Sequence, residues 1–135
     1  MGRDIFVDTG AFIAMRAKDD ANYGKAQGFL NTIRDKRLKL HTTNFILDEV
    51  YTYFCKSHEV AVDMAELIMN NPLIILHRIS AEDEKRAWEI LKQYRDKTFS
   101  YTDACSFALM ERLKIDTAFT FDEHFNMMKF RSLPL

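Results

Sequence analysis

Four carboxylates, far apart in the 135-residue chain, could share one piece of chemistry: Asp8, Glu49, Asp103 and Asp122. Carboxylates held within a few ångströms of one another repel and raise one another's pKa. A hard divalent cation such as Mg²⁺ or Mn²⁺ reverses that cost, because it prefers oxygen ligands and retains water. A set of this kind suits phosphoryl transfer, in which a metal activates a water and a second metal stabilises the leaving oxygen.

The first of these acids, Asp8, ends a short apolar run near the N-terminus. Ile5, Phe6 and Val7 are typical of a strand that is buried on both faces, as in a parallel sheet. Residues 9–14 begin with Thr-Gly and are predicted to continue as an apolar turn. In open α/β sheets, ligands bind in the crevice outside the carboxyl ends of the strands. A charged side chain at that edge is either solvated or functional.

Apolar spacing along the rest of the chain predicts alternating helices and strands. Helices are expected over residues 22–34, 44–55, 58–70 and 80–94, with another that begins near Asp103. Strands are expected over residues 38–42, 73–76 and 116–122, with an edge strand within 128–135. The alternation predicts a single domain over residues 1–135, a three-layer α/β/α sandwich with a central, mainly parallel sheet of four to five strands. Asp8 and Asp122 become close neighbours if the first and fourth strands pair.

Two of the expected helices would carry the other acids. On a helical wheel of about 100° per residue, Glu49 lies at the edge of the apolar stripe of its helix, whereas Asp48 points to solvent. Glu49 is therefore the acid expected in a cleft. Asp103 opens a helix rich in small residues, which we expect to be the most buried helix. As a structural alternative, Asp103 could be only a helix cap, with Thr102 as a rival for that role.

Other polar residues have structural interpretations. Cys55 and Cys105 are predicted to be buried, reduced thiols, which fit a reducing cytoplasm. His41 has no second His or Cys at ligand spacing, so it is interpreted as a polar residue at a strand end. His124 is interpreted as a surface residue. The acids at 82–84 are predicted to stabilise the start of a helix.

Charge and hydropathy limit the function classes only in part. The chain has 19 Lys and Arg against 20 Asp and Glu, a net charge of −1, which neither demands nor excludes nucleic acid. A protein that only coats a phosphate backbone usually has a basic excess. The charged run 34–37 is interpreted as a solvated helix end in preference to a binding patch. No apolar run approaches the length of a membrane span and no secretory segment opens the chain, so we expect a cytoplasmic protein without membrane contact.

Four short motifs carry a resemblance to a known family. They lie at residues 7–9 (Val-Asp-Thr), 44–50 (Asn-Phe-Ile-Leu-Asp-Glu-Val), 101–104 (Tyr-Thr-Asp-Ala) and 120–125 (Thr-Phe-Asp-Glu-His-Phe). In this order and spacing they resemble the PIN-domain ribonucleases. The size and motif order are similar to the single-domain toxins of VapBC-type toxin–antitoxin modules, and the resemblance spans essentially the whole chain.

The resemblance implies a Mg²⁺- or Mn²⁺-dependent endoribonuclease whose site is built from acids. On that basis Asp8, Glu49, Asp103 and Asp122 bind metal and activate water, and the hydroxyl positions that buttress them are Thr9, Thr102 and Thr120. The family commonly forms homodimers, and a cognate antitoxin inhibits its toxin members. Candidates for contact with the RNA substrate are Arg16, Lys18, Lys97 and Arg131.

Three alternatives remain open from the sequence. The same fold could serve as a non-catalytic module that binds RNA or protein, or as an RNA-processing PIN nuclease outside a toxin–antitoxin pair. A phosphatase or a phosphoacceptor domain with Asp8 as nucleophile is the third. Haloacid-dehalogenase-like phosphatases have another acid two residues after that Asp, whereas Gly10 stands there in this chain.

Overall fold

The computed structural model describes residues 3–34 and 37–134 of the chain. Five strands in these residues form one sheet in the order β3-β2-β1-β4-β5, and every neighbouring pair is parallel. The strands are β1 (Asp4–Val7), β2 (Lys39–Thr43), β3 (Ile74–His77), β4 (Thr117–Phe119) and β5 (Arg131–Leu133). The predicted central parallel sheet is confirmed.

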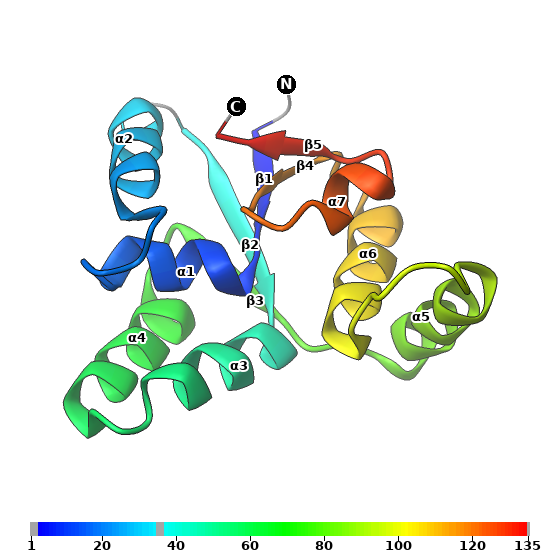
Figure 1. Cartoon of the computed structure of the whole chain (residues 1–135), viewed down its shortest axis with the longest axis horizontal. Helices are drawn as coiled ribbons and strands as arrows, with labels where there is room; N and C mark the ends of the chain where they lie inside the picture. The colour runs from blue at the N-terminus through cyan, green and yellow to red at the C-terminus, as the bar shows by residue number, and fades with distance from the viewer. Residues whose placement is uncertain (1–2, 35–36, 135) are drawn as a thin grey trace.

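Helices cover both faces of this sheet, as predicted for a three-layer sandwich. They are α1 (Thr9–Arg16), α2 (Tyr23–Ile33), α3 (Asn44–Phe54), α4 (His58–Asn70), α5 (Ala81–Gln93), α6 (Tyr101–Leu113) and α7 (His124–Met127). Figure 1 shows α1 to α4 on one side of the sheet and α5 to α7 on the other. The change of side follows from right-handed crossovers, because the strand order reverses direction after β3. The reversal makes the carboxyl ends of β1 and β4 a topological switch point, where ligands bind in such sheets.

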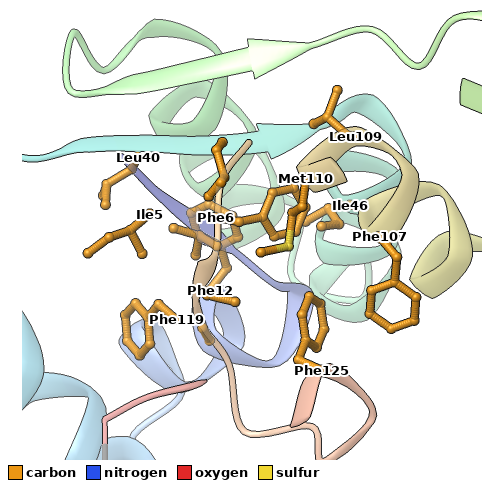
Figure 2. Close-up of a cluster of buried hydrophobic side chains, with 14 of the residues drawn as sticks. Ile5, Phe6, Phe12, Leu40, Ile46, Phe107, Leu109, Met110, Phe119 and Phe125 are labelled. Atoms are coloured by element: carbon orange, nitrogen blue, oxygen red, sulfur yellow. The ribbon is translucent and has the colours of Figure 1, made fainter. Parts of the chain in front are cut away.

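The hydrophobic core is built around β1 and α6. Ile5, Phe6 and Val7 have no exposed surface, as expected for a central strand with both faces covered. Figure 2 shows the side chains of Phe6, Phe119 and Ile46 among the buried cluster. This packing fixes the end of β1, and therefore the place of the residue that follows it.

The helix α6 is the most buried of the described helices, as predicted. Seven consecutive residues, 104–110, are buried. Ala104 and Ala108 are small, which lets the helix lie close to its neighbours, while Phe107 stacks edge-to-face on Phe125 at a centroid distance of 5.0 Å. The start of α6, which carries Asp103, is therefore held firmly against the sheet.

Two elements next to the predicted acids differ from the expected boundaries. Residues 9–16 form the helix α1, whereas an apolar turn was predicted, because Ala11 and Phe12 bury one helical face against the core. The strand β4 ends at Phe119, short of the predicted 116–122. The Thr120 hydroxyl accepts the backbone N–H of Asp122 at 3.0 Å, which turns the chain away from the sheet. Asp122 consequently lies in a loop between β4 and α7.

Other element ends move by a few residues. The helix α2 and the strand β5 lie within the predicted segments 22–34 and 128–135. Positions 35–36 of the charged run and position 135 lie outside the described residues. None of the helices in the described part of the chain has both the length and the apolar character needed to cross a bilayer.

The two thiols and His41 show where pattern-based interpretation was incomplete. Cys105 is buried as predicted, but the prediction for Cys55 is wrong: it is exposed, because the last turn of α3 extends beyond the core. His41 is buried within β2, and its ring nitrogens lie 2.8 Å from His77 Nε2 and 2.8 Å from Asp4 Oδ1. The neighbouring strands β1 and β3 supply these partners, so sequence spacing could not reveal them.

Candidate active site

A groove of about 450 Å³ opens at the carboxyl ends of β1 and β4, at the topological switch point. Its lining includes all four predicted acids, and the full set is Asp8, Thr9, Gly10, Glu49, Thr98, Ser100, Asp103, Phe121, Asp122 and His124. A larger cavity of about 630 Å³ lies between α2 and α4, but its described lining is mostly apolar and includes no carboxylate. The acid-dependent chemistry expected from the sequence therefore belongs to the smaller groove, which we call the acid groove.

Asp8 is the most buried of the four acids, with only 6% of its surface exposed. It occupies the N-cap position of α1, but its side chain makes no capping hydrogen bond. Instead, Oδ2 accepts a hydrogen bond of 3.0 Å from the Thr120 hydroxyl. Burial, followed by the charges of Asp103 and Asp122, raises the pKa of Asp8 to about 7, although hydrogen bonds from Thr9 and Thr120 act in the opposite direction.

Glu49 reaches the acid groove from α3, which lies beside α1. The Thr9 hydroxyl donates a hydrogen bond of 2.5 Å to Glu49 Oε1 and so joins the start of α1 to the middle of α3. The helical-wheel prediction agrees with this geometry, since Glu49 is half-buried whereas Asp48 is exposed. Glu49 is thus held by one hydroxyl and lines the acid groove.

Asp103 lies in the first turn of α6 and takes part in a capping box. Ser100 is the N-cap: its hydroxyl accepts the Asp103 N–H at 2.9 Å, and Asp103 Oδ2 accepts the Ser100 N–H at 3.1 Å. Asp103 therefore contributes to the cap, as the structural alternative proposed, but from the third position of α6, and neither it nor Thr102 is the N-cap. The capping contact uses Oδ2, and Oδ1 has no hydrogen bond among the described residues.

Asp122 and His124 complete the far side of the acid groove. The His124 N–H donates to Asp122 Oδ1 at 2.9 Å, and His124 Nδ1 lies 3.0 Å from Asp103 Oδ2 and 3.3 Å from Asp122 Oδ1. Donor atoms of Asp103, Asp122 and His124 all lie within 4.8 Å of one another. This spacing allows the three side chains to hold one cation together.

The prediction that His124 is a surface residue is wrong, because the loop after β4 folds its ring back toward α6. Only 18% of its side chain is exposed. Burial lowers the pKa of His124, but the hydrogen bond that its ring donates to Asp103 and the charge of Asp122 outweigh burial and raise the pKa overall. The available signal was its place two residues after Asp122 in the same turn.

The three predicted hydroxyl positions behave differently. Thr9 and Thr120 each donate a hydrogen bond to one of the acids. Thr102 contributes its backbone carbonyl, which accepts the Ser106 hydroxyl at 2.9 Å, and the described residues include no hydrogen bond from its side chain to an acid. Ser100, which the sequence reasoning did not select, makes the contact with Asp103 instead.

The donor chemistry of the acid groove fits a divalent metal ion. Carboxylate oxygens predominate, with one imidazole nitrogen at hand, and hard cations such as Mg²⁺ and Mn²⁺ accept such ligands. The raised pKa of Asp8 points the same way, since burial and neighbouring acids penalise its negative charge in the protein alone. The chain is therefore an α/β protein with a carboxylate centre at the topological switch point of its parallel sheet.

Comparison with known proteins places the chain more narrowly. The model of the PIN domain family matches residues 5–131, and the chain belongs to this family. The 23S rRNA-specific endonuclease VapC20 of Mycobacterium tuberculosis is 31% identical over 128 residues, which cover 93% of this chain and 95% of that protein. The VapC ribonuclease of Archaeoglobus fulgidus is 28% identical over 123 residues, covering 90% of this chain and 78% of that protein. The resemblance inferred from the four motifs is confirmed.

Solved structures agree with this assignment. The crystal structure of Mycobacterium tuberculosis VapC20, described as a toxin that cleaves the sarcin-ricin loop, matches with a TM-score of 0.85 and 30% identity over 93% of this chain and 95% of that one. The structure of FitAcB from Neisseria gonorrhoeae matches with a TM-score of 0.69 over 96% of both chains, at 13% identity. The second match supports the fold alone.

Proposed function

We propose that this chain is a metal-dependent endoribonuclease, which hydrolyses RNA phosphodiester bonds in the acid groove. The observation that carries the proposal is the convergence of four acids from β1, α3, α6 and the loop after β4 on one groove. Like charges that are buried together destabilise a fold unless a cation neutralises them, so a cluster of this kind marks a candidate functional site. The names of the relatives, an endonuclease specific for 23S rRNA and a ribonuclease, support RNA as the substrate class.

The residues divide into two groups by their contacts. Asp8, Asp103 and Asp122 would hold Mg²⁺ or Mn²⁺, since the first is buried at the floor of the groove and the others approach one another through His124. When bound, the cation supplies positive charge to the phosphate oxygens and to the attacking water. Glu49, oriented by the Thr9 hydroxyl, is placed to accept a proton from that water. Thr120 keeps Asp8 in a fixed orientation.

We further propose that the chain acts as the toxin of a type II toxin–antitoxin module in the cytoplasm. The solved relative is described as a toxin, which supports this role and a protein antitoxin as partner. In an assembly of two copies, the contact surface would be the exposed face of α5. Trp88 is 56% exposed there, and Glu84, one turn before Trp88, accepts a hydrogen bond from the exposed Tyr101 of α6. An antitoxin that covers the acid groove would block access of RNA to the acids.

The decisive experiment is cleavage of an end-labelled mixed-sequence RNA with Mg²⁺, with Mn²⁺ and with chelator. We expect internal fragments only when a metal is present, and we expect Asp8→Asn, Asp103→Asn and Glu49→Gln to reduce the rate at least about a hundredfold. The matched control is Asp48→Asn, which changes an exposed carboxylate on the same helix as Glu49 and should leave the rate unchanged.

The opposite result would be equally informative. If the wild-type protein stays inert with both metals yet binds RNA or a protein partner equally well in chelator, the acid groove is not a working metal site. The non-catalytic binding module on the same fold would then replace the nuclease.

A further inference from the structure

A second hollow, of about 430 Å³, lies at the far ends of α1 and α3. Its lining combines two exposed cations, Arg16 and Lys18, with the aromatic rings of Tyr53 and Phe54 and one acid, Asp19. None of these five residues belongs to the acid groove. We call this feature the aromatic hollow.

The aromatic hollow is aligned with the acid groove along one seam between two helices. Figure 1 shows α1 and α3 running side by side in the same direction from the end of the sheet. At the start of the seam, Thr9 contacts Glu49; seven residues further along α1 stands Arg16, and four residues further along α3 stands Tyr53. At a rise of about 1.5 Å per residue, Arg16 lies about 10 Å beyond Thr9 along α1, and Tyr53 lies about 6 Å beyond Glu49 along α3. Because Glu49 and Tyr53 are one turn apart, they share a face of α3.

The chemistry of the hollow favours a single-stranded nucleic acid. Tyr53 is 57% exposed, and Phe54 supports its ring in an edge-to-face contact at a centroid distance of 4.9 Å and an interplanar angle of 83°. Arg16 and Lys18 form no ion pair within the part of the chain that the structure describes. A rigid exposed ring beside uncompensated cations is the combination that stacks bases and contacts phosphates.

A single exposed tyrosine is ordinary on a protein surface and needs no function. Two observations separate Tyr53 from that case: its ring is braced by Phe54, and it shares a helical face with an acid of the groove. Tyr51, on the same helix, is also exposed but lies about 160° away around the helix axis. The two tyrosines therefore form a matched pair.

We propose that the aromatic hollow is a base-binding subsite for the RNA substrate, in which one base stacks on Tyr53 while Arg16 and Lys18 contact the adjoining phosphates. The proposal rests on the function proposed above, because it assigns a path to the strand that enters the acid groove. The step of about 6 Å from Glu49 to Tyr53 corresponds to about two stacked nucleotides at ~3.4 Å each, and the step of about 10 Å to Arg16 corresponds to about three. The stacked base thus lies within about three nucleotides of the cleaved bond.

The first test compares cleavage of one RNA oligonucleotide by Tyr53→Ala, Tyr53→Phe and Tyr51→Ala. Stacking of one base on an aromatic ring is worth about five- to a hundredfold in affinity. We expect Tyr53→Ala to raise KM at least about fivefold with kcat changed less than about twofold, and Tyr53→Phe, which keeps the ring, to match the wild type. Tyr51→Ala should also match the wild type.

The second test locates the base. An abasic nucleotide is placed at successive positions of the same oligonucleotide, and KM is measured for the wild type and for Tyr53→Ala. We expect the wild type to lose affinity at one position within about three nucleotides of the cleaved bond, and we expect the variant to be insensitive there. Equal sensitivity of both proteins at every position would overturn the subsite.

The two proposals fail in different ways. If the wild type cleaves RNA and Tyr53→Ala has an unchanged KM, the subsite is wrong and the nuclease stands. If the wild type does not cleave, fluorescence anisotropy of the same oligonucleotides in chelator still compares Tyr53→Ala with Tyr51→Ala. Equal binding by these two variants overturns the subsite in that case as well, and a loss confined to Tyr53→Ala supports it.

Discussion

Thr120 is the residue through which two of the acids are connected. Its hydroxyl donates to Asp8 Oδ2 and accepts the backbone N–H of Asp122, both at 3.0 Å, and the residue is almost fully buried. Thr120→Val keeps the shape but removes both hydrogen bonds, so it should destabilise the fold by about 1–3 kcal/mol. We also expect a fall in the cleavage rate. Urea denaturation and cleavage assays measure the two effects.

A second variant separates the effect of the Thr120 hydroxyl from that of its methyl group. Thr120→Ser retains the donor and acceptor, and we expect it to keep most of the stability and the cleavage rate. If Thr120→Val were as stable and as active as the wild type, Asp8 would not depend on this hydroxyl for its orientation.

Asp8 should stabilise the protein only when a cation is bound. In chelator its buried charge faces Asp103 and Asp122, so Asp8→Asn, which is isosteric and neutral, should unfold at a higher temperature than the wild type. Each kcal/mol corresponds to about 3–5 °C in a domain of this size. Adding Mg²⁺ or Mn²⁺ should raise Tm of the wild type more than that of the variant, because the cation binds only the folded protein.

Thermal melts with and without chelator check this prediction, with Asp48→Asn as the control for a change of net charge alone. A wild type that is more stable than Asp8→Asn in chelator would contradict it. That outcome would mean that the hydrogen bonds from Thr9 and Thr120 outweigh burial and repulsion.

The residues of the site were predictable to different degrees. Asp8 ends a strand and Glu49 lies at the edge of an apolar stripe, so periodicity predicted a strand-end position for the first and a cleft-facing position for the second. Ser100 and His124 were missed, because their contacts with Asp103 depend on the path of two loops. Local pattern specifies which face of an element is buried, but it does not specify how a loop folds back.

At the scale of elements, α5 and α6 are joined by an ion pair whose carboxylate is buried and whose guanidinium is half exposed. Asp83, which is 2% exposed, accepts hydrogen bonds from Arg112 Nε at 2.7 Å and Nη2 at 3.0 Å. The Arg112 hydrogen bonds lower the pKa of Asp83 below its usual 3.8, although burial opposes them. The stabilisation is therefore complete above about pH 4 and is lost as the pH falls through the lowered folded value.

We expect Asp83→Asn to lower the free energy of unfolding by about 1–3 kcal/mol at pH 7, with a smaller difference below pH 4. Urea denaturation over a pH series measures the change. Glu111→Gln is a matched control, because Glu111 pairs with Arg86 between the same two helices, at the surface. Exposed pairs contribute little, so this control should be close to wild type. Equal losses for both variants would contradict the role of burial.

The helix α2 carries a glycine that the fold does not require. Gly28 lies in the helix interior, is exposed, and has open space where a Cβ would be placed. Gly28→Ala should therefore stabilise the protein by about 0.4–1 kcal/mol, because alanine loses less backbone entropy on folding. A thermal melt measures the gain, and the cleavage rate should not change. A lower Tm would show that alanine meets a contact at this position.

The elements themselves were more predictable than their ends. Alternating apolar runs indicated parallel strands and covering helices, and the right-handed crossover rule then predicted helices on both faces of the sheet. The helix α1 was missed, because its eight residues follow β1 without a break and include only a short apolar pattern. The strand β4 was overextended, because the turn made by Thr120 depends on a side-chain hydrogen bond.

At the scale of the whole molecule, the charge balance bears on how the protein meets RNA. The net charge is −1, but the four acids of the groove are four of the 20 acids, which leaves 16 against 19 Lys and Arg elsewhere. With a cation bound in the groove, the remaining surface is weakly basic. Few phosphates can then be contacted by lysine and arginine at once, unlike in a protein that coats a phosphate backbone.

We therefore expect a shallow salt dependence of RNA binding. For single strands, each phosphate contact contributes about −0.7 to the slope of log K against log salt concentration, so two to four contacts give about −1.4 to −2.8. Anisotropy titrations of a single-stranded oligonucleotide at several KCl concentrations, with Mg²⁺ fixed and the cleavage-deficient Asp103→Asn variant, measure this slope. Arg16→Ala combined with Lys18→Ala should flatten the slope by about 1.4. A slope steeper than about −5 would contradict the expectation, because it would require more phosphate contacts than this surface charge supports.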